Sequence, residues 1–91
     1  MFYRIVNVNP KPDYTVQLTF SGGTTVIVDF NDVIAEGGVY ASLADPRLFG
    51  QVSIGPRGRF IEWPGNIDFC ADALRLEGKI LEVDDLPRAG A

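Results

Sequence analysis

The clearest alternation of apolar and polar side chains runs through residues 14 to 20, YTVQLTF. Aromatic and aliphatic residues occupy every second position, and threonine and glutamine lie between them, which is typical of a strand with one buried face. A second alternating run, TTVIVDF, follows at residues 24 to 30 after the short connection Ser-Gly-Gly. The two runs together predict a β-hairpin.

The length of the connecting loop decides which side chains meet across this hairpin. A two-residue loop would mix polar and apolar side chains on both faces of the hairpin. A three-residue loop pairs Leu18 with Val26 and continues the apolar match along both strands. We expect this second register, because burial of one continuous apolar face fixes the pairing. The last loop residue then adopts a left-handed backbone, which Gly23 does without steric cost.

Further strands are expected on both sides of the hairpin. Residues 2 to 8, FYRIVNV, predict a first strand that ends before the two prolines of NPKPD. Residues 52 to 63, VSIGPRGRFIEW, predict a second hairpin with a four-residue loop and with Val52 facing Ile61. The segment KILEV at residues 79 to 83 is expected to return as a strand.

Two or three short helices are expected beside these strands. In FNDVIAEGG a helix begins with Asn31 as its cap, and in ADPRLFG the side chain of Asp45 caps a single turn that opens with Pro46. Residues 71 to 78, ADALRLEG, predict a last helix that ends at its glycine. The fold class is therefore α+β, with a small antiparallel sheet built from hairpins and short helices on one face.

The single tryptophan lies in the segment FIEWPGNIDF. The simplest interpretation is that a strand ends at Trp63, that Pro64 and Gly65 form a turn, and that the chain then approaches the last helix. Trp63 would pack this turn onto the sheet. An exposed Trp63 would instead anchor a protein interface, where Trp, Tyr and Arg contribute most. Tyr40 and Asp68 are the other candidate partner-binding residues.

Length and charge narrow the possible functions. The 91 residues predict one domain, residues 1–83, followed by a tail at residues 84–91 that is rich in charge, proline and glycine. Twelve acidic and eight basic residues give a net charge of −4, and the basic residues are scattered. Because nucleic-acid binders cluster Lys and Arg against phosphates, direct nucleic-acid contact is not expected. Arg57 and Arg59 in GPRGR are interpreted as a solvated turn.

Candidate catalytic chemistry is sparse. The sequence lacks histidine, which removes Ser-His-Asp and Cys-His activation and the commonest metal ligand. The sole cysteine, Cys70, forms no intramolecular disulfide and is interpreted as a small buried or capping residue. Two carboxylate pairs flank predicted helix starts, where the helix dipole favours them: Asp29 with Asp32, and Asp68 with Asp72. We expect no catalytic residue, no metal site and no cofactor.

The compartment is expected to be the cytoplasm. The first residues, MFYRIVNVNP, lack the long apolar stretch of a signal peptide, and no run approaches the ~20 apolar residues that span a bilayer. No contact with a membrane is expected. A domain this short buries a modest share of its surface, so a homo-oligomer is compatible with the sequence.

Four short motifs follow one another in a fixed order and carry a family resemblance. They are F-x-x-G at residues 20–23, V-D-F at 28–30, D-P-x-x-F at 45–49, and W-P-G-N-x-D at 63–68, leading to Leu74. In their order and spacing they resemble the bacterial domain-of-unknown-function family 2442, over residues 1 to 77. The chain departs from that pattern at residues 70–72, Cys-Ala-Asp, where the family typically has Ser-Pro-Glu. A thiol accepts hydrogen bonds poorly, so the cap of the last helix is expected to be weak.

The resemblance implies a small α+β domain without established enzymatic activity, found alone or fused to a helix-turn-helix, and suspected of being the antitoxin-like half of a toxin–antitoxin pair. Our first hypothesis is a non-catalytic module that binds another protein, such as a basic toxin that an acidic surface would complement. A second is a small-ligand binder or carboxylate-dependent enzyme, which requires converging aspartates. A third is an accessory subunit of a DNA-binding regulator.

Overall fold

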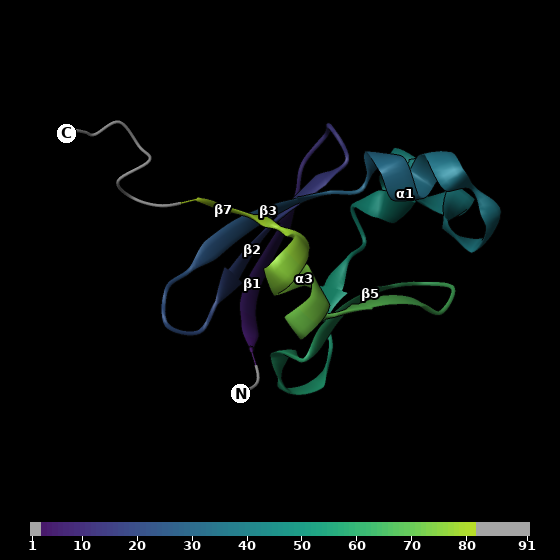
Figure 1. Ribbon diagram of the computed structural model, residues 1–91. Helices are drawn as coiled ribbons and strands as arrows, with labels where there is room; N and C mark the ends of the chain where they lie inside the picture. The colour runs from purple at the N-terminus through teal and green to yellow at the C-terminus, as the bar shows by residue number, and fades with distance from the viewer. Residues whose placement is uncertain (1–2, 82–91) are drawn as a thin grey trace.

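Strands and short helices alternate along the chain, and the computed structural model describes residues 3–81. The elements are β1 (Ile5–Pro10), β2 (Thr15–Phe20), β3 (Thr25–Asp29), α1 (Asn31–Glu36), the 3-10 helix η1 (Gly38–Ala44), α2 (Pro46–Phe49), β4 (Ser53–Ile54), the 3-10 helix η2 (Pro56–Gly58), β5 (Phe60–Trp63), β6 (Ile67–Cys70), α3 (Ala71–Glu77) and β7 (Lys79–Leu81). This mixture confirms the predicted α+β class (Figure 1).

The strands divide into two antiparallel sheets, whereas the sequence predicts one. The larger sheet has the order β1-β2-β3-β7, and the smaller one has the order β4-β5-β6. Helix α3 contacts both β3 and β6, and in Figure 1 it lies between the two sheets. The core is therefore enclosed by two small sheets and the helices that join them.

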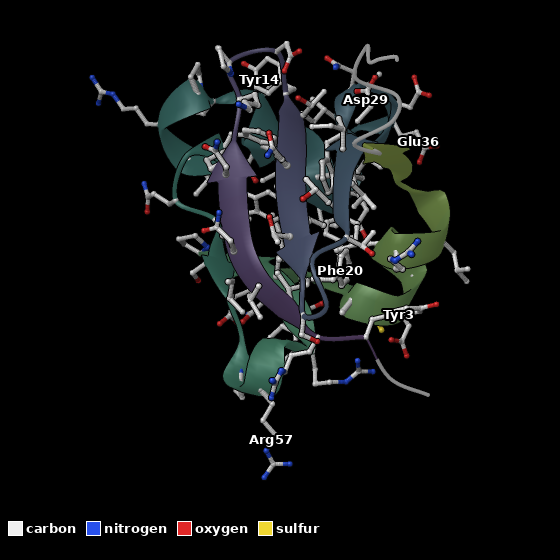
Figure 2. All side chains as sticks on the ribbon, turned by 90° about the vertical axis from the view of Figure 1, so that its left-hand side faces the viewer. Tyr3, Tyr14, Phe20, Asp29, Glu36 and Arg57 are labelled. Atoms are coloured by element: carbon white, nitrogen blue, oxygen red, sulfur yellow. The ribbon has the colours of Figure 1, made fainter. Side chains whose placement is uncertain are left out.

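The register of the β2–β3 hairpin is the predicted one. Leu18 pairs with Val26, and the Phe20 N–H donates to the Thr24 carbonyl at 2.8 Å, which leaves a three-residue loop. Gly23 has a φ of +98°, the left-handed conformation that such a loop requires. Alternate side chains of both strands consequently face the core, and Thr and Gln side chains face the opposite side, which Figure 2 shows in front.

The end of the first strand differs from the prediction. β1 continues through Pro10, because a proline is tolerated on an edge strand. The strand predicted at residues 79–83 is β7 as far as Leu81. Residues 82 and 83, and the tail predicted at residues 84–91, lie outside the described residues.

The second hairpin has the predicted four-residue loop but a different register. The Gly55 N–H donates to the Phe60 carbonyl at 2.8 Å, and Ile54 pairs with Ile61. The predicted pairing of Val52 with Ile61 is therefore wrong by two residues. A shift of two positions leaves every side chain on its original face, so the apolar pattern alone does not distinguish the two registers.

Strand β6 is an element that the sequence interpretation missed. Pro64 and Gly65 form the predicted turn, but the chain then returns along β5 as a strand, with Trp63 paired to Ile67. The predicted approach to a helix is wrong for this segment. Gly65 and Asn66 both have positive φ, +97° and +66°, which turns the chain back within three residues.

One predicted helix cap is wrong and another is confirmed. Asn31 is the first residue of α1 and not its cap, and the capping position, Phe30, makes no side-chain cap hydrogen bond. The carboxylate of Asp29, at the end of β3, instead accepts from the Asn31 backbone N–H at 2.8 Å and from its Nδ2 at 2.7 Å. Asp45 caps α2 as predicted and accepts from the Arg47 N–H at 3.0 Å.

Trp63 lies in an aromatic core. Its side chain is 3% exposed, and its indole Nε1–H donates to the Phe49 carbonyl at 2.8 Å. The Phe30 ring meets the indole edge-on, with centroids 5.4 Å apart. The interpretation of Trp63 as a packing residue is confirmed, and its interpretation as an exposed interface anchor is wrong.

Candidate protein-interaction site

An apolar groove opens between α1 and α3 and has a volume of about 270 Å³. We call it the α1–α3 groove. It is lined by Val28, Asp29, Phe30, Val33, Phe69, Ala73 and Leu74. Only one of these seven residues carries a charge. The lining comes from β3 and α1, which follow one another in the chain, and from β6 and α3, which do so about 30 residues later; the fold brings the two pairs together.

The groove exists because two elements cover their neighbours incompletely. β7 pairs with β3 at Thr25–Ile27 only, so the end of β3, at Val28 and Asp29, extends beyond its partner strand. Helix α1 has no buried residue, and its apolar Val33 and Ile34 are only half-buried. Apolar side chains at this point are consequently left partly open to solvent.

Tyr40, a predicted partner-binding residue, lies at the border of this groove. Its half-buried ring stacks at a tilt on the groove-lining ring of Phe69, with centroids 5.6 Å apart. Phe69 is itself edge-on to Phe30, 5.0 Å away, so Tyr40 continues the core aromatics outward. The neighbouring Val39 is 72% exposed. Apolar surface therefore extends from the groove onto η1.

The charges beside the groove are negative. Asp29 lines it, and α1, which contributes Val33, also carries the exposed carboxylates of Asp32 and Glu36. Because Asp32 and Glu36 are four residues apart, they lie on the same side of the helix. In Figure 2, Asp29 and Glu36 lie at one end of the molecule and Arg57 lies at the opposite end.

Asp68, another predicted partner-binding residue, lies elsewhere. It alternates with Phe69 along β6, so the two side chains point to opposite faces of the small sheet. The cross-strand neighbour of Asp68 is Glu62, and neither carboxylate makes a hydrogen bond or ion pair with any described residue. Like charges directly opposite one another destabilise a sheet. Because Tyr40 stacks on Phe69, and Phe69 and Asp68 point to opposite faces of the sheet, Asp68 and Tyr40 do not share one surface.

Asp72 of α3 and Arg59, the residue before β5, form an ion pair, and both also bond to the backbone of Tyr3. Arg59 Nη1 and Nη2 lie 3.1 and 3.0 Å from the two carboxylate oxygens of Asp72, and the Tyr3 N–H donates to Asp72 Oδ1 at 2.9 Å. Arg59 also donates to the Tyr3 carbonyl. The Arg59 hydrogen bond is the main cause that lowers the pKa of Asp72, and the Tyr3 N–H adds to it. The interpretation of GPRGR as a solvated turn is wrong for Arg59, whereas Arg57 is exposed.

Comparison with models of protein families assigns the chain to one family. The model of the family described as "Protein of unknown function (DUF2442)" matches residues 5–79. The chain belongs to this family. No curated protein and no solved structure matches it.

In this DUF2442 domain the aspartates of the two predicted carboxylate pairs do not converge on one site. Asp29 bonds to Asn31, Asp72 bonds to Arg59, and Asp68 lies on the outer face of the small sheet. Within residues 3–81 no three His, Cys, Asp or Glu side chains gather in a way that could hold a metal ion. Cys70 occupies the capping position of α3 but makes no cap hydrogen bond, so the weak cap is confirmed. Its side chain is exposed, so its interpretation as a buried residue is wrong.

Sequence reasoning missed Val33, Phe69 and Ala73 as site residues of this DUF2442 domain. From the sequence, Phe69 was placed in a segment that leads into the last helix, because strand β6 was not predicted. The one available signal was the short helix 31–36, whose apolar residues are too few to bury a full face.

Within the described part of the chain, no helix has the length and apolar character needed to cross a membrane.

Proposed function

We propose that this DUF2442 domain is a non-catalytic protein-interaction module. The observation that carries the proposal is the α1–α3 groove, an apolar hollow between elements that otherwise share one core. Binding sites are commonly hollows lined mainly by apolar side chains. The groove, with a volume of about 270 Å³, has room for one or two apolar side chains of a partner.

We further propose that the partner is basic and that the chain is the antitoxin-like member of a cytoplasmic toxin–antitoxin pair. The net charge of −4 supports this, because an acidic surface attracts and orients a cationic protein before contact. Carboxylates beside the groove at Asp29, Asp32 and Glu36 support the same partner chemistry.

The test is complex formation with a defined protein. The full chain and the product of the adjacent gene would be purified separately and mixed, and the stoichiometry and Kd measured by calorimetry and size-exclusion chromatography. We expect a stoichiometric complex. Failure of the two proteins to associate would contradict the proposed pair.

A separate experiment tests whether the chain is non-catalytic. Turnover of a metabolite by the purified chain, abolished by Asp29→Asn without loss of folding, would show that a carboxylate performs chemistry. Circular dichroism of the variant would verify that its fold is retained.

A further inference from the structure

The open apolar surface at the α1–α3 groove is continuous and includes aromatic rings. Val33 and Ala73 lie on its two sides, Phe69 lies within it, and Tyr40 extends it onto η1. The Tyr40 ring stacks at a tilt on the Phe69 ring, and the buried Phe30 ring supports Phe69 edge-on. Rigid aromatic side chains with one face supported by a core are the kind of residue that contributes most to protein binding. The surface therefore has the composition of an anchor site.

Helix α1 is short and only partly packed against the core. It has six residues, none of them buried, and its N-terminal position makes no side-chain cap hydrogen bond. A helix this short is marginal without tertiary contacts. Val33 and Ile34 pack against the core on one side only, so an occupant that covered Val33 would add apolar contact to the part that stays open.

The charges at the groove restrict what the occupant can be. Asp29, Asp32 and Glu36 are exposed carboxylates on the groove wall or on the helix that forms it, and none of the seven lining residues is Lys or Arg. The exposed Arg57 lies at the opposite end of the molecule (Figure 2). An acidic or uncharged segment would gain nothing from these carboxylates, whereas a cationic one would pair with them.

We propose that the α1–α3 groove docks a cationic amphipathic segment of a partner protein. One or two apolar side chains of the segment enter between Val33 and Ala73 against Phe69. Lys or Arg side chains next to them pair with Asp32 and Glu36. This inference rests on the proposed protein-interaction function and adds to it the docking surface and the chemistry of the docked segment.

A synthetic peptide pair tests the partner chemistry directly. One 14-residue peptide carries Leu at helical three- and four-residue spacing with Lys at the other positions, and its counterpart carries Glu in place of Lys. Each would be titrated into the ¹⁵N-labelled full chain, and amide shifts recorded. We expect the Lys peptide to shift the amides of Val33, Tyr40, Phe69 and Ala73, and the Glu peptide to shift none of them.

Two matched pairs of variants test the surface. Ala73→Arg fills the groove, and Asn7→Arg adds the same side chain to an exposed position on the larger sheet. Glu36→Lys reverses a charge beside the groove, and Asp68→Lys reverses one on the small sheet. We expect Ala73→Arg to weaken binding of the Lys peptide at least about tenfold and Glu36→Lys to weaken it about three- to tenfold. The two control variants should change affinity less than about twofold.

The outcomes separate this inference from the function on which it rests. Shifts of the Lys peptide that map to the outer face of the larger sheet, or an affinity unchanged by Ala73→Arg, would overturn the docking site. If the adjacent gene product binds the wild-type chain and Ala73→Arg equally, the inference fails and the proposed function stands. If it binds neither protein, whereas the Lys peptide binds the groove, the proposed pair fails and the docking surface stands.

Discussion

Trp63 joins segments that are distant along the chain. It is held by its hydrogen bond to the Phe49 carbonyl and by ring contacts with Phe30, Phe49 and Phe69. Sequence alone identified Trp63 as an unusual residue but did not decide between burial and exposure. The decision depends on α2 and β6, whose contacts with the indole are set by tertiary structure.

Replacement of Trp63 by Ala should therefore destabilise the fold strongly. We expect Trp63→Ala to lower the free energy of unfolding by about 3–5 kcal/mol, because it leaves a cavity in an aromatic core. Trp63→Phe should lose less, because it keeps a ring and removes the hydrogen bond to Phe49. Urea denaturation followed by circular dichroism measures both. A loss below about 1 kcal/mol for Trp63→Ala would contradict the burial.

Asp72 makes the stability of the domain depend on acidity. Arg59 and the Tyr3 N–H hold the pKa of Asp72 below its ordinary value of 3.8. A carboxylate whose pKa is lower in the folded chain stabilises the fold at pH above its unfolded pKa, and this contribution is lost as the pH falls through the folded pKa.

Asp72→Asn should consequently lower the free energy of unfolding at pH 7, and its difference from wild type should shrink below about pH 4. Urea titrations at several pH values measure this. Asp13, whose pKa is lowered chiefly by the Thr15 hydroxyl, is present in both proteins, so the variant should keep part of the acid dependence. A difference that is the same at pH 7 and at about pH 2.5 would contradict this role of Asp72.

At the scale of elements, the loop between β4 and β5 packs directly against β1. Gly58 in η2 has a φ of +69°, and a Cβ there would lie 2.4 Å from the Ile5 carbonyl oxygen. Gly65, in the turn between β5 and β6, also has a positive φ, +97°, but a Cβ there would meet nothing within 4 Å.

The two glycines make a matched pair of substitutions. Both Gly58→Ala and Gly65→Ala introduce backbone strain of about 1–2 kcal/mol. Gly58→Ala should cost clearly more, because the new methyl group collides with a backbone that cannot move freely. Chemical denaturation compares them. Equal losses would show that η2 does not pack against β1 as closely as the structure indicates.

The small sheet has two acidic side chains directly opposite one another, an arrangement that does not stabilise the fold. Glu62 and Asp68 are direct cross-strand neighbours and both are acidic. Asp68→Thr should therefore raise the free energy of unfolding by about 0.2–1 kcal/mol, through loss of repulsion and a gain in strand propensity. Thermal denaturation at low salt measures this, and Ser53→Thr, which changes strand propensity on the same sheet without removing a charge, is the control. A destabilised Asp68→Thr would contradict the repulsion.

Elements with a local pattern were predictable, and those fixed by distant contacts were not. Alternation along YTVQLTF gave the β2–β3 register, and Asp45 with Pro46 gave the start of α2. β6 was missed because IDFC is too short to show a period, and its pairing to β5 is visible only in the fold. The cap at Asn31 failed because the helix begins one residue earlier than expected, with Phe30 at the capping position, and Asp29 accepts from the backbone N–H and the Nδ2 of Asn31.

At the scale of the whole molecule, the candidate site could be predicted only in part. The acidic balance was available from sequence because it is a property of composition, and Tyr40 could be chosen as a candidate from its residue type. The α1–α3 groove was not, because Val33, Phe69 and Ala73 meet only when α3 packs between the two sheets. A site formed where coverage is incomplete has no sequence motif of its own.

We propose that the chain acts by binding a protein at the α1–α3 groove. Hydrogen exchange of the full chain, alone and in complex with the adjacent gene product, tests this most directly. Exchange in α1 should be fast in the free chain, because α1 has no buried residue. We expect binding to slow exchange from Val33 to Tyr40 and to leave exchange in the β1–β2 pair unchanged. A complex that protects β1 and β2 and leaves α1 as fast as before would contradict this proposal.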